Sequence, residues 1–431
     1  MRQSRYTVVA EGDNGEHLLY QAATGAFAVL DEAAFRDFRE ASGPQAPQLA
    51  EAGFLTELSA EEELAAVQER FAAARADRSA LTLSIVPTYA CNYRCPYCYE
   101  LGHNAIKGKM DERVMNAICS FVEQRYEADG FTALSVQWYG GDPSLALDVV
   151  CELSGRFIAW CDAHDVAYDA MMLTNANLIN DETARLMADA RIRFVYLTID
   201  GPEELHNVRR VAADGSNSYQ KNIQAARYLR EHGIDVQATM NVDKVSWPLY
   251  PQLRARLYQE EGIVLNAAKL CDYGGCFGRE PFCAPHFDLF THEEFAHARF
   301  EQYAGEGHGE ADLRELLRPI DRFCSGQLEN YFVIDLLGDV YKCDGRVGEK
   351  DYVRFNLFDD PSTWALSEVT HDPTHDEQCA ACELLPLCMG NCHWERACNG
   401  WPCHPFRYTI DGYLRLLRAC SDAPATGVTI L

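Results

Sequence analysis

Three cysteines close together in the sequence have the spacing of an iron–sulfur ligand set. Cys91, Cys95 and Cys98 form a Cys-x-x-x-Cys-x-x-Cys pattern directly after the apolar run 81–86, which predicts a strand. A [4Fe–4S] cube needs four ligands, one for each iron, and this segment supplies three. The fourth iron is then open to an exogenous ligand, as an open metal position is for a substrate. A zinc site is the alternative, but zinc sites usually need a second Cys pair.

The segments that follow this loop resemble motifs of the radical S-adenosylmethionine (SAM) superfamily. Residues 138–143 (Trp-Tyr-Gly-Gly-Asp-Pro) are similar to the family's Gly-Gly-Glu-Pro motif, with Asp142 in place of Glu. Residues 198–202 (Thr-Ile-Asp-Gly-Pro) are similar to the family's Ser-Ile-Asp-Gly-Pro segment. The resemblance implies that the methionine end of SAM chelates the open iron. It also implies a set of SAM-contacting residues: Tyr97, Gly140, Gly141, Asp142, Asn175, Thr198 and Asp200.

A second array of cysteines lies between residues 324 and 403. Its spacing resembles the SPASM domain, which in relatives holds two auxiliary [4Fe–4S] clusters, so three clusters are expected in all. A pair of zinc knuckles is the alternative. The resemblance implies that Cys324, Cys343 and Cys392 hold the first auxiliary cluster. It implies four ligands for the second: Cys379, Cys382, Cys388 and Cys403.

Two ligand assignments in the array stay open. The first auxiliary cluster lacks a fourth ligand, for which Cys276 or Cys283 is favoured over Cys271, and an open site for a substrate thiol is the alternative. Cys398 competes with Cys403 as the last ligand of the second cluster, and Cys403 is preferred because the residues after it resemble the family's closing segment. The remaining cysteines are expected to be small buried hydrophobes. They are Cys119, Cys151, Cys161 and Cys420.

The elements that must position these residues alternate between apolar runs and helical patterns. From residue 81 onward this alternation predicts parallel strands joined by right-handed crossovers. An α/β fold with a partial, TIM-like (β/α)6 barrel is therefore expected, and its ligands should gather at the carboxyl ends of the strands, where the motifs fall. The expected strands are 81–86, 135–139, 171–174, 194–199, 236–240 and 263–265.

The whole chain is expected to have four parts. Residues 1–57 alternate strand-like and turn-like pieces. This module resembles the small winged-helix-like recognition elements of peptide maturases, which pair a leader peptide with an exposed strand edge; a plain structural cap is the alternative. A helical linker is expected at 58–80, the barrel at 81–305 and the Cys-rich SPASM domain at 306–431.

Composition limits the partners and the compartment. The 431 residues carry a formal net charge of -27, which argues against a nucleic-acid partner because phosphate binding needs basic stripes. No signal peptide and no apolar run long enough for a membrane span is visible, so a cytoplasmic protein without a membrane partner is expected. The resemblance implies a precursor peptide with a leader sequence and an electron donor of the flavodoxin or ferredoxin type.

The function implied by the resemblance is that of a radical SAM peptide maturase. A 5′-deoxyadenosyl radical would oxidise a ribosomally made peptide, with a Cys thioether crosslink as the leading product and carbon–carbon crosslinking or epimerisation as alternatives. Anaerobic sulfatase maturation, which forms formylglycine, is the alternative enzyme function. Relatives of that group have a catalytic Asp directly after the cysteine that corresponds to Cys343, and Asp344 stands at this position. Asp344 could instead be a turn residue before Gly345. An iron–sulfur electron carrier without radical chemistry is opposed by the SAM motifs.

Overall fold

The chain folds into two compact units, each built from separated stretches of sequence. The computed structural model describes residues 1–100, 107–273, 287–398, 403–421 and 427–430. Unit 1 comprises residues 1–76, 291–327 and 371–431, and unit 2 comprises residues 77–290 and 328–370. The four-part division expected from the sequence stays a prediction.

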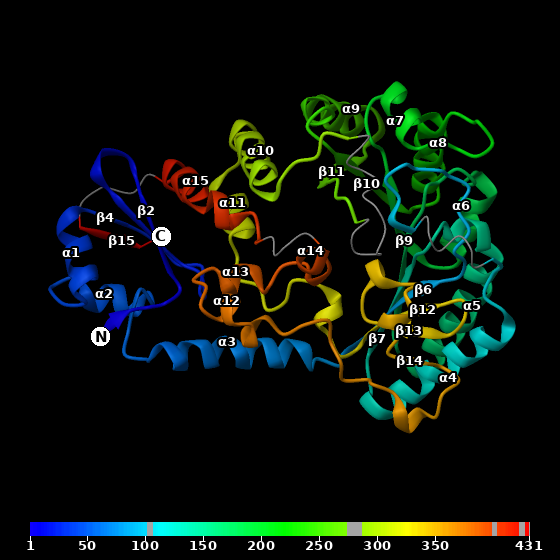
Figure 1. Ribbon diagram of the computed structural model, residues 1–431, viewed down its shortest axis with the longest axis horizontal. Helices are drawn as coiled ribbons and strands as arrows, with labels where there is room; N and C mark the ends of the chain where they lie inside the picture. Colours follow the sequence, from blue (N-terminus) through cyan, green and yellow to red (C-terminus); the bar gives the residue numbers. More distant parts are fainter. Residues whose placement is uncertain (101–106, 274–286, 399–402, 422–426, 431) are drawn as a thin grey trace. The chain divides into compact units, whose positions relative to one another are not determined.

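Unit 2 is built on a sheet whose main part is parallel (Figure 1). Within the described residues it has nine strands in the order β11-β10-β9-β8-β7-β6-β12-β13-β14. The strands from β6 to β11 are parallel neighbours in chain order, with helices between them. This pattern confirms the expected α/β partial barrel. Its strands are β6 (Ala80–Val86), β7 (Ala133–Trp138), β8 (Ala167–Leu173), β9 (Ile192–Thr198), β10 (Asp235–Val242) and β11 (Val264–Lys269).

Some helices of unit 2 begin and end at residues with recognisable capping roles. Asp111, for example, accepts a hydrogen bond from the Val114 amide at the start of α4, and Gly130 ends that helix at φ 63°. None of the described helices is long and apolar enough to cross a membrane. The α-helices are α4 (Glu112–Asp129), α5 (Leu147–His164), α6 (Asp181–Asp189), α7 (Glu203–Arg209), α8 (Ser218–Glu231) and α9 (Tyr250–Glu261).

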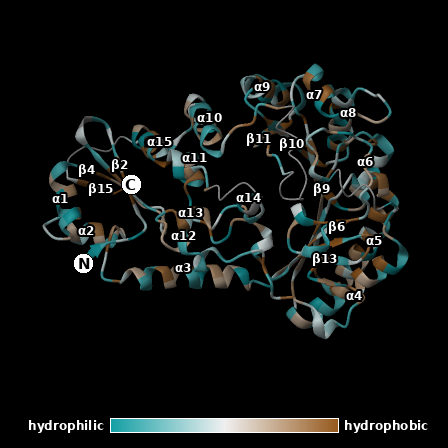
Figure 2. Cartoon of the chain, viewed as in Figure 1, coloured by the Kyte–Doolittle hydropathy of each residue, from teal (hydrophilic) through white to brown (hydrophobic). Residues whose placement is uncertain are grey.

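Strand β6 is apolar because both of its faces are covered. In β6 the side chains of Leu81, Leu83 and Ile85 have no exposed surface. Figure 2 shows this hydrophobic colouring along the strand labelled β6. Continuous apolar runs of this kind are typical of parallel strands buried on both sides.

A hairpin from the Cys-rich part of the chain extends the barrel sheet. Its strands are β12 (Tyr331–Asp335) and β13 (Asp339–Tyr341), followed by β14 (Phe355–Asn356). Gly338 supplies the positive φ of 82° that the turn requires. β12 pairs in parallel with β6, a pairing that the sequence did not indicate. Because of this pairing, the residues after β13 follow a strand of the same sheet as β6, the strand that precedes the cysteine loop.

Unit 1 contains a smaller antiparallel sheet. Within the described residues its strands lie in the order β15-β4-β3-β2, and β1 pairs separately with β5. Leu18 and Tyr20 of β3 pack with residues of α15 on one face, whereas Leu19 packs with residues of α1 and α2 on the other. The strands are β1 (Arg2–Gln3), β2 (Thr7–Glu11), β3 (His17–Gln21), β4 (Phe27–Leu30), β5 (Leu55–Thr56) and β15 (Val428–Ile430).

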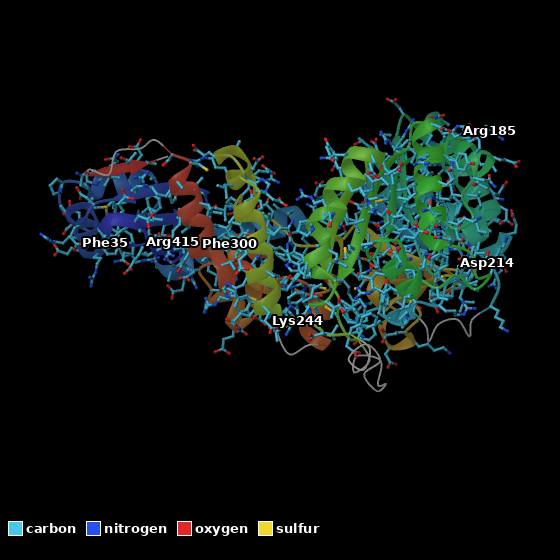
Figure 3. The ribbon with its side chains drawn as sticks, turned by 90° about the horizontal axis from the view of Figure 1, so that it is seen from above. Phe35, Arg185, Asp214, Lys244, Phe300 and Arg415 are labelled. Atoms are coloured by element: carbon cyan, nitrogen blue, oxygen red, sulfur yellow. The ribbon has the colours of Figure 1, made fainter. Side chains whose placement is uncertain are left out.

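Helices from three separate stretches of the chain complete unit 1. Phe300 of α10, labelled in Figure 3, packs edge-on against Tyr413 of α15 at a centroid distance of 4.9 Å. A side chain at Gly412 would collide with the Phe300 ring. The α-helices are α1 (Glu32–Glu40), α2 (Ala46–Glu51), α3 (Ala60–Arg75), α10 (His292–Gly305), α11 (Glu310–Leu316), α12 (Glu377–Ala380), α13 (Leu385–Cys388), α14 (His393–Cys398) and α15 (Phe406–Ala419).

The cysteines outside the proposed ligand sets differ in burial. Cys161 is buried, as expected. Cys119 and Cys151 are only half-buried, and Cys420 is exposed. The expectation of a buried Cys420 is therefore wrong, because this residue stands at the C-cap of α15, beyond the apolar face that the helix buries.

Candidate active site

The cysteine loop after β6 is a packed segment tied to a distant part of unit 2. Its three cysteines pack in one cluster with Tyr93 and Ala212. The backbone is fixed by a hydrogen bond of 2.8 Å from the Arg94 amide to the Val211 carbonyl oxygen. Burial raises the pKa of Cys91 to about 11, so binding of a metal to this thiol has to displace a proton. The loop therefore brings together the three thiols that the sequence predicted as ligands.

Gly140 and Gly141 follow β7 and lie directly against this loop. A Cβ atom on Gly141 would come within 2.4 Å of the carbonyl oxygens of Tyr89 and Ala90. Gly140 has a φ of 110°, which other residues rarely adopt. The Asp142 amide donates a 2.9 Å hydrogen bond to the Ala90 carbonyl oxygen. Glycine is therefore needed at both positions so that the two loops can approach each other.

Asp142 presents one carboxylate oxygen that is still free to bind a ligand. Its Oδ1 accepts hydrogen bonds from the Thr174 hydroxyl at 2.7 Å and from the Ser144 amide at 3.0 Å. Its Oδ2 is buried and has no hydrogen-bond partner among the described residues. Burial raises the pKa of this carboxyl group. A cationic group bound beside the loop, such as an ammonium, would satisfy Oδ2.

Tyr97 and Asp200 form a hydrogen-bonded group next to the loop. The Tyr97 hydroxyl donates to Asp200 Oδ2 and accepts from Nη1 of Arg210 at 3.0 Å. The other oxygen of Asp200 accepts from the Asn241 amide at 2.8 Å. The Tyr97 ring lies edge-on to Phe287 at a centroid distance of 6.0 Å. Tyr97 is thus held by both its hydroxyl and its ring.

The other two predicted SAM contacts lie at neighbouring strand ends. Asn175 donates from Nδ2 to Oδ1 of Asn92 in the cysteine loop at 2.6 Å. Thr198 is half-buried, and its carbonyl oxygen accepts from Nδ2 of Asn222 at 2.8 Å. Asn175 therefore contacts the loop itself, whereas Thr198 is the last residue of β9.

Asp344 lies near a second half-buried carboxyl group, Glu100. The Tyr331 hydroxyl donates a 2.6 Å hydrogen bond to Oδ2 of Asp344. Oδ1 of Asp344 and Oε1 of Glu100 are both buried, and neither has a hydrogen-bond partner in the described part of the chain. Burial, followed by the charges of Asp344 and Asp142, raises the pKa of Glu100 to about 7. Glu100 is therefore close enough to Asp344 and to Asp142 for their charges to affect it.

Tyr139 lies near both this carboxyl group and the cysteine loop. Burial and then the charges of Asp344, Cys343 and Cys98 raise the pKa of Tyr139 far above its usual value. Such charge effects require these groups to lie near one another within unit 2. The residue pair that the sequence singled out, Cys343 and Asp344, thus faces the same region as the third cysteine of the loop.

Glu100, Arg210 and Tyr331 are the residues of this site to which sequence reasoning gave no role. Glu100 stands two positions after Cys98, and an acidic residue beside thiolate ligands was the one available signal. The contact of Tyr331 with Asp344 depends on the hairpin geometry, which the sequence does not reveal.

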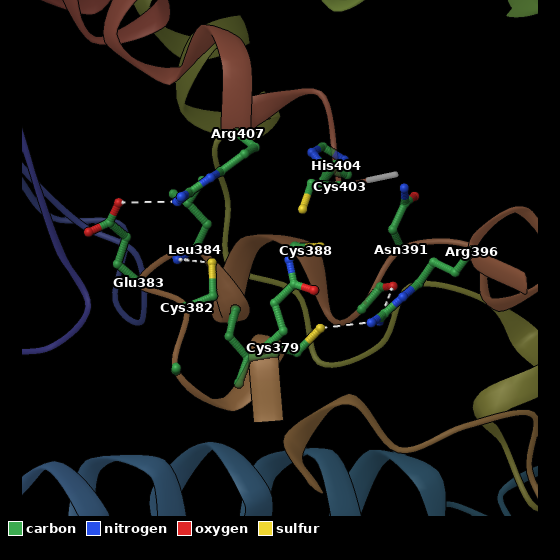
Figure 4. Close-up of a pocket in the computed structure, with 14 residues that line it drawn as sticks. Cys379, Cys382, Glu383, Leu384, Cys388, Asn391, Arg396, Cys403, His404 and Arg407 are labelled. Atoms are coloured by element: carbon green, nitrogen blue, oxygen red, sulfur yellow. Dashed lines mark hydrogen bonds and ion pairs between the residues drawn. The ribbon is translucent and has the colours of Figure 1, made fainter. Parts of the chain in front are cut away.

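A cavity of about 450 Å³ in unit 1 is lined by four cysteines (Figure 4). They are the four assigned by resemblance to the second auxiliary cluster: Cys379, Cys382, Cys388 and Cys403. Nη1 of Arg396 lies 3.1 Å from Cys379 Sγ. Burial raises the pKa of Cys388 to about 12. Four thiols around one cavity fit the donor chemistry of an iron–sulfur cluster.

The residues assigned to the first auxiliary cluster fall in both units. Cys324 and Cys392 belong to unit 1, where the charge of Cys324 contributes to a raised pKa of Cys392 after burial. Cys343 belongs to unit 2. Cys276 and Cys283 lie outside the described residues.

The remaining candidate ligands differ in what the structure describes. Cys271 is buried, and the Lys269 ammonium donates to its sulfur at 2.9 Å. The side chain of Cys398 is not described. No group of three or more His, Cys, Asp or Glu side chains in the described ranges is arranged to hold a metal ion.

Comparison with known sequences places the cysteine loop and the strand-end motifs in one family. The model of the Radical SAM superfamily matches residues 85–245. The chain is 25% identical over 350 residues to the cysteine-type anaerobic sulfatase-maturating enzyme of Clostridium perfringens, covering 72% of this chain and 88% of that enzyme. It is 23% identical over 357 residues to the serine-type enzyme of Bacteroides thetaiotaomicron, covering 75% and 82%.

Solved structures show a similar fold. Native anSMEcpe with bound AdoMet and the Cp18Cys peptide matches with a TM-score of 0.60 and 18% identity, covering 79% of this chain and 99% of that one. Streptococcus suis SuiB matches with a TM-score of 0.50 and 16% identity, covering 93% and 98%. At these identities the likeness shows the fold alone.

The fold and the site define an α/β enzyme with a thiol cluster at the carboxyl edge of a partial barrel. Residues 85–245 match the Radical SAM superfamily, so the chain contains a radical SAM domain. SAM and a [4Fe–4S] cluster are the cofactors of this family. The loop fits them, because its donors are the thiols that iron–sulfur clusters require and because Asp142 Oδ2 is buried without a partner among the described residues.

Proposed function

We propose that the enzyme is a peptide maturase that oxidises a ribosomally made peptide and forms a Cys thioether crosslink. One observation carries the proposal: Oε1 of Glu100 and Oδ1 of Asp344 are buried without a hydrogen-bond partner among the described residues, in the unit that contains the cysteine loop. SAM bound at the loop would supply a 5′-deoxyadenosyl radical that removes a hydrogen atom from the peptide. The residues of this chain must then orient the substrate thiol and take its proton.

Asp344 is proposed as the acceptor of that proton. Tyr331 holds one carboxylate oxygen and leaves Oδ1 available to a substrate thiol. Glu100 raises the proton affinity of the site, because two neighbouring carboxylates resist ionising together. Forming the thioether removes one hydrogen atom, one proton and one electron from the peptide.

The electron needs an acceptor, and the cavity of unit 1 is the proposed place for it. The four cysteines that line the cavity would hold an auxiliary [4Fe–4S] cluster, which supplies an electron acceptor when bound. With the first auxiliary cluster and the SAM-binding cluster, this makes three. Turnover would draw electrons from a flavodoxin- or ferredoxin-type donor.

A peptide substrate is supported by the relatives and by unit 1. Two of the similar proteins are sulfatase-maturating enzymes, and one of the similar structures holds a bound peptide. The anSMEcpe structure covers 79% of the chain, whereas SuiB covers 93%. Unit 1 offers a small sheet, and sheets bind extended leader peptides by strand addition.

Formylglycine formation is the second candidate. Its support is the similarity to both cysteine-type and serine-type sulfatase-maturating enzymes. Asp344 would serve that reaction as well, because the oxidation of a Cys or Ser side chain also releases a proton.

The mass of the product separates the two candidates. The enzyme, reconstituted anaerobically with iron, sulfide, SAM and dithionite, would be given either a short Cys-containing peptide encoded beside its gene or a sulfatase-derived Cys peptide. A thioether removes two hydrogens and keeps the sulfur, whereas formylglycine formed from Cys loses the sulfur. Modification of the sulfatase peptide alone would reverse our ranking, and absence of 5′-deoxyadenosine with either peptide would contradict both candidates.

A further inference from the structure

The β4 edge of the unit 1 sheet is covered by a strand of the chain itself. β15 runs antiparallel to β4, with Val428 opposite Leu30 and Ile430 opposite Ala28. Figure 1 shows β15 beside β4. The sequence led us to expect an exposed strand edge in this module, and the structure places residues of the same chain at one.

Alternate side chains of β15 face the apolar layer between the sheet and the helices. Val428 and Ile430 are half-buried and pack against this layer, whereas Thr429 points to the other face because strand residues alternate. Most of the layer has no exposed surface. Its larger members are Leu19, Leu30, Phe38, Leu49 and Phe54.

Asp31 fixes the start of the covering strand. Its Oδ2 accepts a 2.8 Å hydrogen bond from the Gly427 amide, and its own amide donates to the Gly427 carbonyl oxygen at 3.1 Å. Its Oδ1 accepts from the Ala34 amide at 2.9 Å and caps α1. These amide hydrogen bonds lower the pKa of Asp31. Asp31 can therefore bind the backbone of an extended segment through both its carboxylate and its own amide.

The covering strand is held by a small set of interactions. Three residues pair with β4, and their side chains are only half-buried. A strand edge whose backbone groups pair with so short a segment can pair with another strand of the same pattern. An external peptide must nevertheless compete with a segment that is present at high effective concentration because it belongs to the same chain.

We propose that β15 is a built-in occupant of a peptide-docking edge, and that an extended segment of the precursor peptide binds there by displacing residues 427–430. This inference rests on the proposed function, because it names the surface that receives the peptide. The pattern of β15 specifies the partner: a small residue followed by β-branched apolar residues at alternate positions, as Gly427, Val428 and Ile430 provide.

The test uses a fluorescein-labelled synthetic peptide with the sequence of residues 421–431. Its fluorescence anisotropy is measured with the full chain and with a chain that ends at residue 421. The shortened chain should bind the peptide at least about tenfold more tightly, because the competing strand is gone. Equal binding to both chains would overturn the inference, as would no binding to the shortened chain with its fold intact by circular dichroism.

Substituted peptides test which face of the strand is recognised. Peptides carrying Val428→Asp or Ile430→Asp should lose binding to the shortened chain, since a carboxylate would enter the apolar layer. The matched peptide with Thr429→Asp, which puts the same charge on the other face, should retain most of it. Equal losses for all three peptides would show that the strand does not dock in this register. If the shortened chain does not fold, the full chain with Val428→Asp and Ile430→Asp takes its place.

The leader of the precursor peptide provides the last test, once mass spectrometry has shown that the enzyme modifies this precursor. It should compete with the labelled peptide on the shortened chain, and the truncation should lower the KM for the precursor while leaving kcat unchanged. If the enzyme modifies the precursor but the leader does not compete with the labelled peptide, this inference is refuted and the proposed function still stands. Binding of the labelled peptide needs neither SAM nor clusters, so failure of the peptide chemistry is detected separately.

Discussion

The hydroxyl of Tyr331 donates a 2.6 Å hydrogen bond to Oδ2 of Asp344. Tyr331 opens β12, which pairs in parallel with β6, and β6 leads directly into the cysteine loop. The hydrogen bond therefore orients the Asp344 carboxylate beside a strand of the sheet whose strand β6 leads into the loop with Cys91. Because the other oxygen has no partner among the described residues, the arrangement suits a positioned proton acceptor.

Replacing Asp344 should separate radical formation from product formation. Asp344→Asn is expected to lower peptide modification by about 10² to 10⁴-fold, the usual contribution of a general base, while 5′-deoxyadenosine still forms. Tyr331→Phe should cost about tenfold, because it removes one hydrogen bond to a charged group. The exposed Asp351→Asn is the matched control in the same unit. Equal loss of 5′-deoxyadenosine and product in D344N would assign Asp344 to the binding of SAM instead.

A methyl group at Gly141 should damage the cysteine loop. The added Cβ would lie 2.4 Å from two carbonyl oxygens of the loop, so the backbone has to move. Gly141→Ala is expected to lower the iron bound by about four atoms per chain and to abolish 5′-deoxyadenosine formation. Gly155→Ala is the control, because it lies in α5 with no atom within 4 Å of the new methyl group, and Ala favours helix there. Full cluster loading in G141A would show that the close approach is not required.

The fold was predictable where burial leaves a continuous apolar pattern. β6 was located within one residue because its run is apolar. β8 begins at Ala167, although the sequence predicted a start at 171, because Asp169 is exposed and interrupts the run. The pairing of β12 with β6 was not predictable, since no local pattern encodes which distant strand a hairpin joins.

The site was predictable where its ligands are neighbours in sequence. The thiols of the cysteine loop lie within eight positions of one another, so spacing alone identifies them. Glu100 and Asp344 come close only through the sheet, and the low solvent exposure that raises their pKa values is not visible in the sequence. The covering of the β4 edge by Val428 and its neighbours was likewise invisible, because a three-residue strand has too little pattern to detect.

Asp335 should make the stability of unit 2 depend on pH. It is 1% exposed and accepts a 2.7 Å hydrogen bond from the hydroxyl of Tyr89, and burial raises its pKa to about 6 from 3.8. Since the folded carboxyl keeps its proton to higher pH than the unfolded one, its stabilising contribution is full below pH 4. That contribution is lost as the pH rises through 6, and it amounts to about 2–3 kcal/mol.

Asp335→Asn removes this titration, so its thermal stability relative to the parent should increase between pH 4 and pH 7. Scanning calorimetry of matched cluster-free samples measures the difference. Asp351→Asn, on an exposed residue, should follow the parent at every pH. A constant difference between D335N and the parent would show that Asp335 does not titrate in this range.

The cavity lined by four cysteines should account for one whole cluster. Removing two of its thiols, Cys379→Ala with Cys382→Ala, leaves too few ligands for a cube, so the reconstituted chain should hold about four fewer iron atoms. The variant should still form 5′-deoxyadenosine, because the loop with Cys91 lies in the other unit. It should not form the crosslinked product, because the cluster proposed as the electron acceptor is missing. Cys420→Ser, on an exposed thiol outside the cavity, is the control and should keep its full iron content. A loss of only one metal atom per chain, found as zinc by elemental analysis, would instead support the zinc-knuckle reading of this array.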